Sequence, residues 1–394
     1  MDFKYESYYD DGANIWMVPY GSLCLYHLDK KTRKLGLESK LPIENQEKHL
    51  SYRIVLYKRK IFLIPFCQDK RLLIYSLTTK QWDIREFLDI KIEDEIKNKA
   101  FFCGGILSKH YIYMFGYATS VILRFDIDTF QFEQISDIMQ EHVLGLSNKE
   151  DGFFHTSYIQ LEDIIYYPFM NTNAVLVFNL TTNKSEVYRI GEEGNRFISI
   201  AFDGLDFWMI PRAEGSIIRW NRETGEQCCY NDYPIGFQNQ LYSVYRAIYW
   251  DGFVWIFRHL GNMNIKVNVS TGKIVQFYLP YDEDKISGCR YPIVNIENDR
   301  IRLDTGRYYE WIELDSTMNI VIKYNFQKSD SCILTEKKYY LQNRQREGII
   351  REDSNCNLTD FLEAKLWDDG YKSQPHKADC GIKVKEYVQK YMII

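Results

Sequence analysis

The sequence predicts an all-β fold, a seven-bladed β-propeller of four-stranded antiparallel blades, with a short α-helical C-terminal extension. Aromatic residues make up 16% of the 394 residues, and Tyr and Phe favour strands over helices. A threonine recurs at regular intervals after a short apolar run, in most repeats three residues after Asp or Asn. A repeat length in the forties is typical of propeller blades. The recurring positions are Thr32, Thr79, Thr129, Thr182, Thr224, Thr271 and Thr317.

The fifth repeat shows the four strands of one blade most clearly. Asp203-Gly204 indicates a hairpin turn, because both residues tolerate a positive φ angle. Pro211 ends the second strand, and Thr224 marks the turn before the fourth. The strands predicted in this repeat are Phe197 to Phe202, Phe207 to Ile210, Ile217 to Trp220 and Gln227 to Tyr230.

The other repeats follow the same order along the chain, although the seventh is degenerate. Their predicted second strands are Ile15 to Val18, Ile61 to Ile64, Tyr111 to Phe115, Ile164 to Tyr167, Val254 to Phe257 and Arg300 to Leu303. The segment from Tyr5 to Tyr9 already supplies a first strand to blade 1. We therefore expect the ring to close by packing of blade 7 on blade 1, and not by an exchanged strand.

The Asp or Asn before each repeated Thr has a physical role in the turn between the third and fourth strands. A short side-chain oxygen can accept hydrogen bonds from backbone N–H groups two residues further on, which closes such a turn. The repeated pair is therefore predicted to be a folding signature and not a catalytic one.

The order of these signals resembles the repeats of kelch-type propellers. Repeat 2 has Thr79 followed by Trp82, and repeat 3 runs from Tyr111 to Gly116 and then from Phe125-Asp126 to Thr129. The resemblance covers roughly residues 1 to 328. Kelch blades carry a Gly pair after the second strand, whereas this chain has Pro in four repeats and a single Gly in repeat 3. The resemblance implies a kelch-like propeller, a fold that serves enzymes, adaptors and receptors alike.

The repeat ends near residue 328, so we expect two parts, a propeller over 1–328 and an extension over 329–394. Apolar residues from Leu358 to Leu366 fall on one helical face, with Asn357 as a helix N-cap. A second short amphipathic helix is predicted from Ile382 to Tyr391. These helices would dock on the propeller of the same chain or bind a partner.

Composition narrows the function classes. The net charge is −5, which disfavours nucleic-acid binding. The nine Cys have no zinc-finger spacing and indicate free thiols in a reducing compartment. The N-terminus lacks the apolar region of a signal peptide, and no run of eighteen apolar residues occurs. We therefore expect a cytoplasmic protein with no membrane contact.

Signatures of catalysis and metal binding are missing from the sequence. It contains no metalloprotease helix, nucleophile elbow, phosphate-binding loop or dinucleotide fingerprint. The seven His have no metal-ligand spacing, so no metal or cofactor is predicted. The acidic run from Asp282 to Asp284 indicates a solvated loop more than a cation site.

The candidate site is on the face that carries the Pro-led loops. In an up-and-down blade the loops after the second and fourth strands emerge on one face, and the tight turns emerge on the other. Variable loops on a rigid scaffold usually carry binding. The residues that follow Pro or its equivalent are Tyr20, Phe66, Tyr117, Phe169, Arg212 and His259.

Polar residues also open the innermost strands on this face. They are Ser7, Arg53, Ser199 and Arg246, with Ser157 one step closer to its Pro and with Arg196 and Arg258 nearby. Together these groups predict a funnel with aromatic walls and guanidinium groups, suited to a planar, sugar-like or anionic ligand or to an acidic peptide. The alternative is that the aromatics pack one blade on the next and the arginines bridge blades through backbone carbonyls.

The favoured function is a non-enzymatic binding or scaffold protein that recognises a ligand, peptide or protein partner on the Pro-loop face. The main alternative is a propeller enzyme, a lyase, cyclase or hydrolase, with its active site at the mouth of the central channel. In that case His259, Arg212 and Arg246 would bind or polarise the substrate, and a loop carboxylate or Tyr would act as the base.

Overall fold

The computed structural model describes residues 5–19, 24–43, 52–65, 71–87, 102–117, 119, 121–137, 152–238, 241, 243–259, 261–280, 294–297, 299–304, 310–325, 327 and 328. Strands, turns and loops make up all of these residues, so none of them belongs to a helix that could cross a membrane. The two helices predicted after residue 329 and the acidic run at 282–284 lie outside the described residues.

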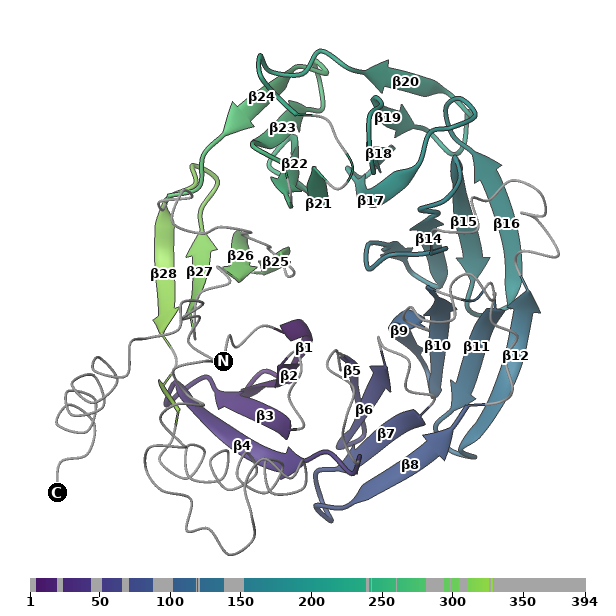
Figure 1. Cartoon of the computed structure of the whole chain (residues 1–394), viewed down its shortest axis with the longest axis vertical. Coiled ribbons are helices and arrows are strands. Elements are labelled where there is room, and N and C mark those ends of the chain that lie inside the picture. Colours follow the sequence, from purple (N-terminus) through teal and green to yellow (C-terminus); the bar gives the residue numbers. More distant parts are fainter. Residues whose placement is uncertain are drawn as a thin grey trace, which may run out of the picture. The chain divides into compact units, whose positions relative to one another are not determined.

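Seven antiparallel sheets surround a central axis, as the sequence predicts (Figure 1). Blade 1 consists of β1 (Tyr5–Asp10), β2 (Asn14–Pro19), β3 (Cys24–Asp29) and β4 (Lys34–Lys40). Blade 2 consists of β5 (Tyr52–Tyr57), β6 (Lys60–Pro65), β7 (Arg71–Ser76) and β8 (Trp82–Glu86). Blade 3 consists of β9 (Phe102–Ser108), β10 (Tyr111–Gly116), β11 (Val121–Asp126) and β12 (Gln131–Asp137).

The second half of the ring repeats this arrangement. Blade 4 consists of β13 (Ile159–Leu161), β14 (Ile164–Pro168), β15 (Ala174–Asn179) and β16 (Lys184–Arg189). Blade 5 consists of β17 (Phe197–Phe202), β18 (Phe207–Pro211), β19 (Ile217–Trp220) and β20 (Gln227–Tyr230). Blade 6 consists of β21 (Val244–Trp250), β22 (Phe253–Arg258), β23 (Asn264–Asn268) and β24 (Ile274–Phe277). Blade 7 consists of β25 (Val294–Glu297), β26 (Arg300–Asp304), β27 (Glu310–Leu314) and β28 (Ile320–Asn325).

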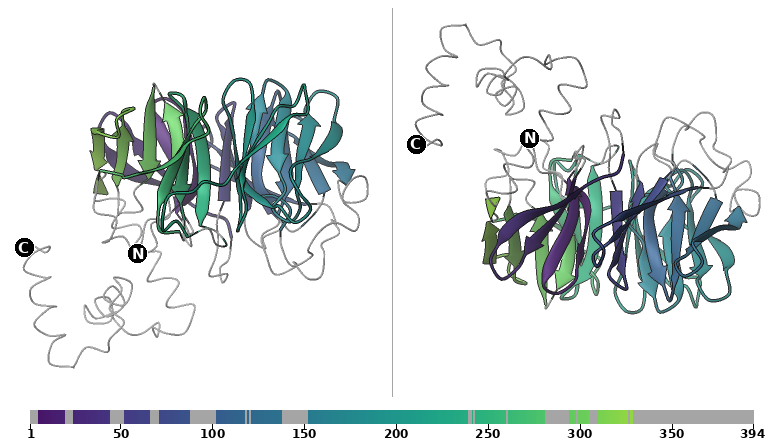
Figure 2. Two further views of the ribbon diagram at one scale, coloured as in Figure 1. Left: turned by 90° about the horizontal axis from the view of Figure 1, so that it is seen from above. Right: turned by 90° about the horizontal axis from the view of Figure 1, so that it is seen from below.

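Each blade takes its four paired strands from one continuous stretch of chain. The sheet of blade 1 begins with β1, and that of blade 7 contains β25 to β28 in sequence order. Neither set of four strands takes a strand from the other blade, as predicted, although a short strand that follows blade 7 does join the sheet of blade 1. The two-residue β29 (Gln327–Lys328) extends the first sheet beside β4. Seen from the edge, the strands cross the ring from face to face (Figure 2).

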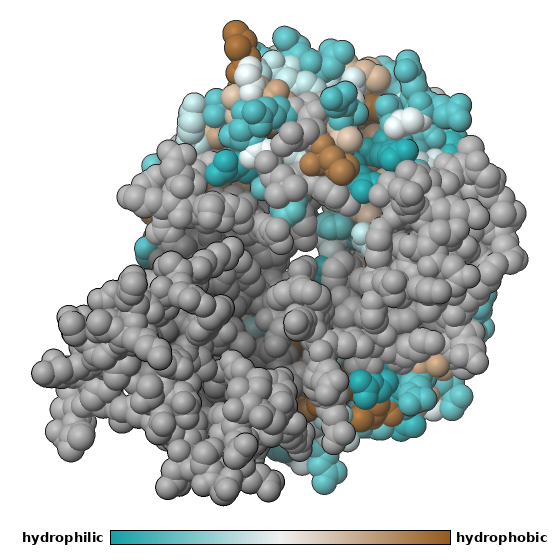
Figure 3. Space-filling model, viewed as in Figure 1, coloured by the Kyte–Doolittle hydropathy of each residue, from teal (hydrophilic) through white to brown (hydrophobic). Residues whose placement is uncertain are grey.

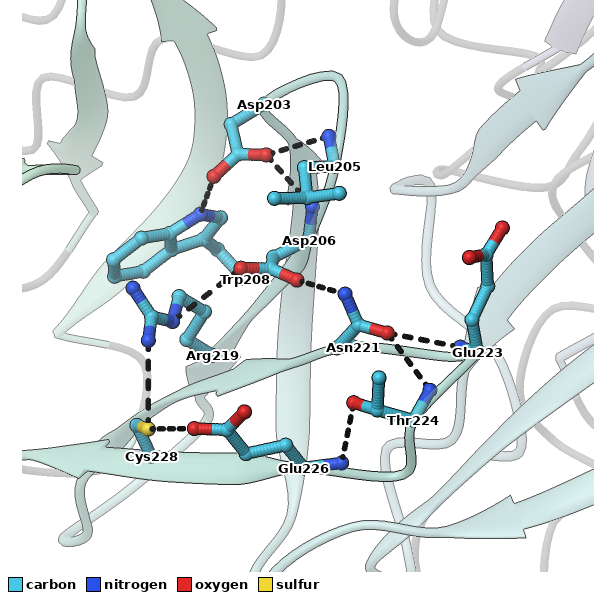
Figure 4. Close-up of polar contacts among 10 residues, drawn as sticks. All are labelled: Asp203, Leu205, Asp206, Trp208, Arg219, Asn221, Glu223, Thr224, Glu226 and Cys228. Atoms are coloured by element: carbon cyan, nitrogen blue, oxygen red, sulfur yellow. Dashed lines mark hydrogen bonds and ion pairs between the residues drawn. The ribbon is translucent and has the colours of Figure 1, made fainter.

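All seven repeated turns are present, and six share one backbone geometry, while the turn of blade 7 from Asp315 to Met318 is one residue shorter. The residue after each Thr has a left-handed φ angle between 57° and 75°. Its N–H donates to the carbonyl of the residue that opens the turn, at 2.8–2.9 Å. Figure 4 shows the turn of blade 5, where Asn221 Oδ1 accepts the N–H groups of Glu223 at 3.0 Å and Thr224 at 2.9 Å. The predicted folding role is confirmed, and the side chain also reaches the third residue.

We expect the change Gly225→Ala to lower the free energy of unfolding by about 1 kcal/mol. Gly225 has φ +75°, and a Cβ there would meet no atom within 4 Å, so the loss would come from the backbone alone. Gly104→Ala is the matched control, because that glycine also has open space but no positive φ. Urea unfolding of both variants checks this, and an equal effect in the two would contradict it.

In the first turn of blade 5, the Asp side chain binds both the backbone of the turn and a tryptophan side chain. Asp203 Oδ1 accepts the N–H groups of Leu205 and Asp206, while Oδ2 accepts the indole N–H of Trp208 at 2.7 Å (Figure 4). Asp11 accepts the indole N–H of Trp16 at 2.8 Å in blade 1. The tight-turn Asp residues of these two blades thus anchor buried tryptophans and serve the fold.

The apolar cores lie between neighbouring blades. The core between blades 3 and 4 is rich in aromatic side chains, and those of blades 5 and 6 share a second core around Trp208. Trp208 and Trp255 are buried completely or almost completely. Burial of apolar surface at about 25 cal/mol per Å² makes these interfaces the main source of stability.

Blades 7 and 1 also meet through a buried ionic network. Arg302 on β26 is 5% exposed, and its Nη2 donates to Glu313 Oε1 on β27 at 3.2 Å. Its Nη1 lies 3.5 Å from Asp10 Oδ2 on β1, which also accepts from Lys30 Nζ at 2.8 Å. One guanidinium therefore joins the last blade to the first.

Candidate ligand-binding site at the channel mouth

The innermost strands of the seven blades begin on one face, and the second strands end on the same face. We call this the mouth face, and Figures 1 and 3 look onto it. Connections after the second and fourth strands emerge there, as predicted from the repeat. The tight turns after the first and third strands, two of which are drawn in Figure 4, emerge on the opposite face.

His155 marks the centre of the candidate site. It lies four residues before β13, is half-buried, and its Nδ1 lies 3.3 Å from Thr156 Oγ1. Burial lowers the pKa of His155, four neighbouring basic residues contribute in the same direction, and together they bring it to about 3. The four charges, in order of their effect, belong to Arg53, His259, Arg246 and Arg212.

These four residues, three arginines and one histidine, come from three blades and lie around His155 of a fourth blade. Arg53 lies on β5, Arg212 follows β18, Arg246 lies on β21, and His259 follows β22. All four were predicted site residues, and the structure brings them together. His155 was not predicted, because the short β13 starts later than the inner strands of the other blades and shifts the repeat alignment.

Backbone carbonyls orient the three arginines. Arg53 Nε donates to Cys103 O at 3.1 Å, Arg212 Nη1 to Met170 O at 3.3 Å, and Arg246 Nη1 to Thr156 O at 3.1 Å. Each bond links two blades, so these arginines do bridge blades through backbone carbonyls, as the alternative prediction holds. A guanidinium has five N–H donors, so such a bond is compatible with a ligand contact.

A buried chain of hydrogen bonds connects Cys103 and Tyr167 to the backbone of His155. Cys103 Sγ is 2.9 Å from Tyr167 Oη, and that hydroxyl donates to the carbonyl of His155. Burial raises the pKa of the Cys103 thiol to about 12 and holds the pKa of Tyr167 well above its usual range. Burial also raises the pKa of Tyr158. All of these groups are therefore neutral near pH 7.

The two serines that open inner strands connect three blades. Ser157 Oγ lies 2.8 Å from Ser199 Oγ and accepts the N–H of Ile200 at 3.2 Å. Ser199 Oγ accepts the N–H of Ala247 at 2.9 Å. Both serines are buried, so they hold blades 4, 5 and 6 in register below the mouth.

The aromatic residues predicted to line the funnel do not all face the mouth. Phe169 is 1% exposed and lies 4.7 Å from the ring of Phe154, inside the core between blades 3 and 4. This is the blade-packing role of the alternative, and it keeps the ring away from solvent. Tyr117 is half-buried, and its ring lies close to Gly152. Tyr20 and Phe66 lie outside the described residues.

Arg196 and Arg258 are half-buried beside the site. The carbonyl of Arg196 accepts the N–H of Arg212 at 2.8 Å, and the N–H of Arg258 donates to Asn264 Oδ1 at 3.0 Å. Neither guanidinium is among the main charges that act on His155.

Asn171 is a residue that no sequence pattern indicated. It follows Met170, whose carbonyl accepts from Arg212, and it is 2% exposed. Neither its Oδ1 nor its Nδ2 has a hydrogen-bond partner in the structure as described. A buried amide with an open donor and acceptor costs free energy, and it lies in the loop after β14 at the mouth face.

One group of three potential metal ligands occurs within the described ranges, on the tight-turn face of blade 3. The ligand atoms of His110, Asp126 and Asp128 lie within 4.8 Å of one another. Asp126 Oδ1 already accepts the N–H groups of Asp128 at 2.8 Å and Thr129 at 3.0 Å. This carboxylate thus serves the repeated turn.

No protein-family model and no curated protein matches the chain, so the kelch-like resemblance is not confirmed. The solved complex of KlAtg21 with the coiled coil of AgAtg16 is 12% identical, with TM-score 0.55, over 83% of this chain and 100% of that one. BamB from Moraxella catarrhalis is 11% identical, with TM-score 0.51, over 76% of this chain and 81% of that one. Virginiamycin B lyase from Staphylococcus aureus is 14% identical, with TM-score 0.49, over 70% and 84%. At this identity the likeness shows the fold alone, a β-propeller.

Proposed function

We propose that this propeller is a binding protein that takes an anionic group of its ligand at the mouth of the central channel. The observation that carries the proposal is the convergence of Arg53, Arg212, Arg246 and His259 around His155, with the three arginines held by carbonyls of blades 3 and 4. Guanidinium groups bind carboxylates and phosphates through charge-assisted hydrogen bonds. Arg53 and Arg212 are 8% and 4% exposed, so their charges act in an environment where water screens them weakly.

The titratable groups at the mouth favour binding over acid–base chemistry. A general acid or base works best with a pKa near the working pH. Burial moves the pKa of His155 down to about 3 and that of Cys103 up to about 12. Tyr167 is likewise held in its protonated form. None of these three groups is poised for proton transfer or nucleophilic attack near pH 7.

The change Arg246→Ala is expected to weaken anion binding by about 10- to 100-fold, the loss of one charge-assisted hydrogen bond. Titration calorimetry with citrate and with a hexaglutamate peptide as probes measures it. Arg246 is half-buried on the surface of β21, so we expect the variant to fold. Binding by the wild type should also weaken as salt is raised.

The matched control for this experiment is Arg219→Ala. Arg219 lies on β19 near the tight-turn face of blade 5, with its Nε 3.4 Å from Asp206 Oδ2 (Figure 4). It should bind both probes like the wild type. The proposed function is wrong if neither probe binds the wild type, or if the two variants lose the same affinity.

A further inference from the structure

The connection between β20 and β21 lies on the mouth face, and its residues 231–238 make several contacts with one another and with neighbouring segments of the chain. The rings of Tyr233 and Phe237 stack with centroids 4.8 Å apart and planes 20° apart. Tyr233 Oη donates to Gly215 O at 2.8 Å, and the N–H of Phe237 donates to Pro234 O at 3.0 Å. These contacts hold residues 231–238 in one conformation.

The same loop is tied to blade 6 beside His259. Gln238 N–H donates to Asn262 Oδ1 at 3.0 Å, and Asn262 Nδ2 donates to Gly236 O at 2.8 Å. The carbonyl of Ser243 accepts the N–H of His259 at 2.9 Å. The loop therefore stands next to the cationic site, in a fixed position relative to it.

The tip of this loop presents an apolar side chain to water. Ile235 is 101% exposed, and Leu241 further along the connection is 52% exposed. Tyr278, which follows β24 on the other side of blade 6, is 72% exposed. Among the described residues, four large apolar side chains are more than half exposed, and three of them are these. Figure 3 shows brown, apolar residues on this face above blades 5 and 6.

Exposed apolar side chains on a preordered loop are typical of protein-docking surfaces. Burial of one such side chain in a complex is worth about 1.5–3 kcal/mol, and a loop that is already ordered loses little further entropy on binding. A small polar anion would gain nothing from these side chains. A partner that fits both features carries acidic and apolar groups on one segment.

We propose that the mouth face over blades 5 and 6 docks an acidic peptide segment of a protein partner. Its carboxylates would lie toward Arg212, Arg246 and His259, and its aliphatic or aromatic side chains would pack on Ile235 and Tyr278. The binding of the peptide's carboxylates rests on the proposed function, and the binding of its apolar side chains rests on the exposed residues of the loop. It names the ligand as a peptide instead of a small metabolite.

The test uses the full-length chain and two fluorescein-labelled peptides of eleven residues. One alternates Glu and Asp with Leu and Phe, and the other has Ser in place of every Leu and Phe. We expect the acidic–apolar peptide to bind the wild type about 10-fold more tightly, because apolar burial adds to the charge. Ile235→Ser should remove most of this difference and leave the affinity for the acidic–serine peptide unchanged.

Leu205→Ser is the matched control, because Leu205 is 69% exposed on the tight-turn face of blade 5. It should bind both peptides like the wild type, whereas Arg246→Ala should weaken both. Equal binding of the two peptides, each weakened by Arg246→Ala, would overturn the docking inference and keep the proposed function. If citrate binds but neither peptide does, the docking inference is likewise overturned and the proposed function is kept. Binding of no anionic probe would overturn both.

Discussion

Replacement of Arg302 by methionine is expected to lower the free energy of unfolding by about 3–5 kcal/mol, the cost of breaking a buried ion pair. The change removes the cation that lies between Glu313 at 3.2 Å and Asp10 at 3.5 Å. Glu313 is 7% exposed, so its carboxylate would stay buried with less compensation. Asp10 belongs to β1 and Glu313 to β27, so the loss falls on the contact that closes the ring. Urea unfolding monitored by tryptophan fluorescence measures it.

Two further variants separate this effect from ordinary packing. The double change Arg302→Met with Glu313→Leu should recover part of the loss, because it removes the buried charge on both sides. Asp83→Ala, which breaks a surface pair with Arg85 at 2.6 Å, should cost less than about 1 kcal/mol. A loss for Arg302→Met as small as that for Asp83→Ala would show that the ring closes through apolar packing alone.

Local signals made the fold predictable from the sequence. The strands predicted at Phe197 to Phe202, Ile217 to Trp220 and Gln227 to Tyr230 are the observed β17, β19 and β20. The ends of these strands are marked by turn residues, whose side chains or backbone preferences determine the conformation of only the few residues around them. The ring-closing contact between Asp10 and Arg302 spans 292 residues and has no such local mark.

The site was predictable to the extent that it follows the repeat. Arg212 and His259 each follow a second strand, and Arg53 and Arg246 each lie near the start of an innermost strand. Both positions recur from blade to blade at the mouth face, so the repeat places these residues near one another. Phe169 occupies an equivalent position too, yet its ring turns into the core between blades. The direction in which a side chain points at a strand end depends on how the next blade packs against it. This direction cannot be predicted from the sequence of one blade alone.

The exposed loop tip could not be predicted for a similar reason. The segment Tyr233-Pro234-Ile235-Gly236-Phe237 reads as an apolar stretch in a connection. Only the stacking of Tyr233 on Phe237 and the positive φ of 84° at Gly236 leave Ile235 outside.

The wild type is expected to lose stability as the pH falls below 6.5, and the change His155→Gln should remove this loss. The ordinary pKa of His is 6.5, and that of His155 in the folded protein is about 3, chiefly because of burial and then because of the charge on Arg53. The unfolded chain therefore binds a proton in the window between these values that the folded protein does not bind. The resulting loss of stability is absent above pH 6.5 and grows as the pH falls toward 3, by about 1.4 kcal/mol for each pH unit.

Urea unfolding at pH 7.5, 6.5, 5.5 and 4.5 tests this expectation. Between pH 6.5 and 4.5 the wild type should lose about 2–3 kcal/mol more than His155→Gln, because glutamine cannot take up the proton. His155→Asn should reproduce the smaller slope, since a packing defect would shift its curve by the same amount at every pH. Parallel curves for the wild type and both variants would mean that His155 is protonated alike in the folded and unfolded chain. The positive charges of Arg53, His259, Arg246 and Arg212 would then act too weakly at the mouth to hold an anion as we propose.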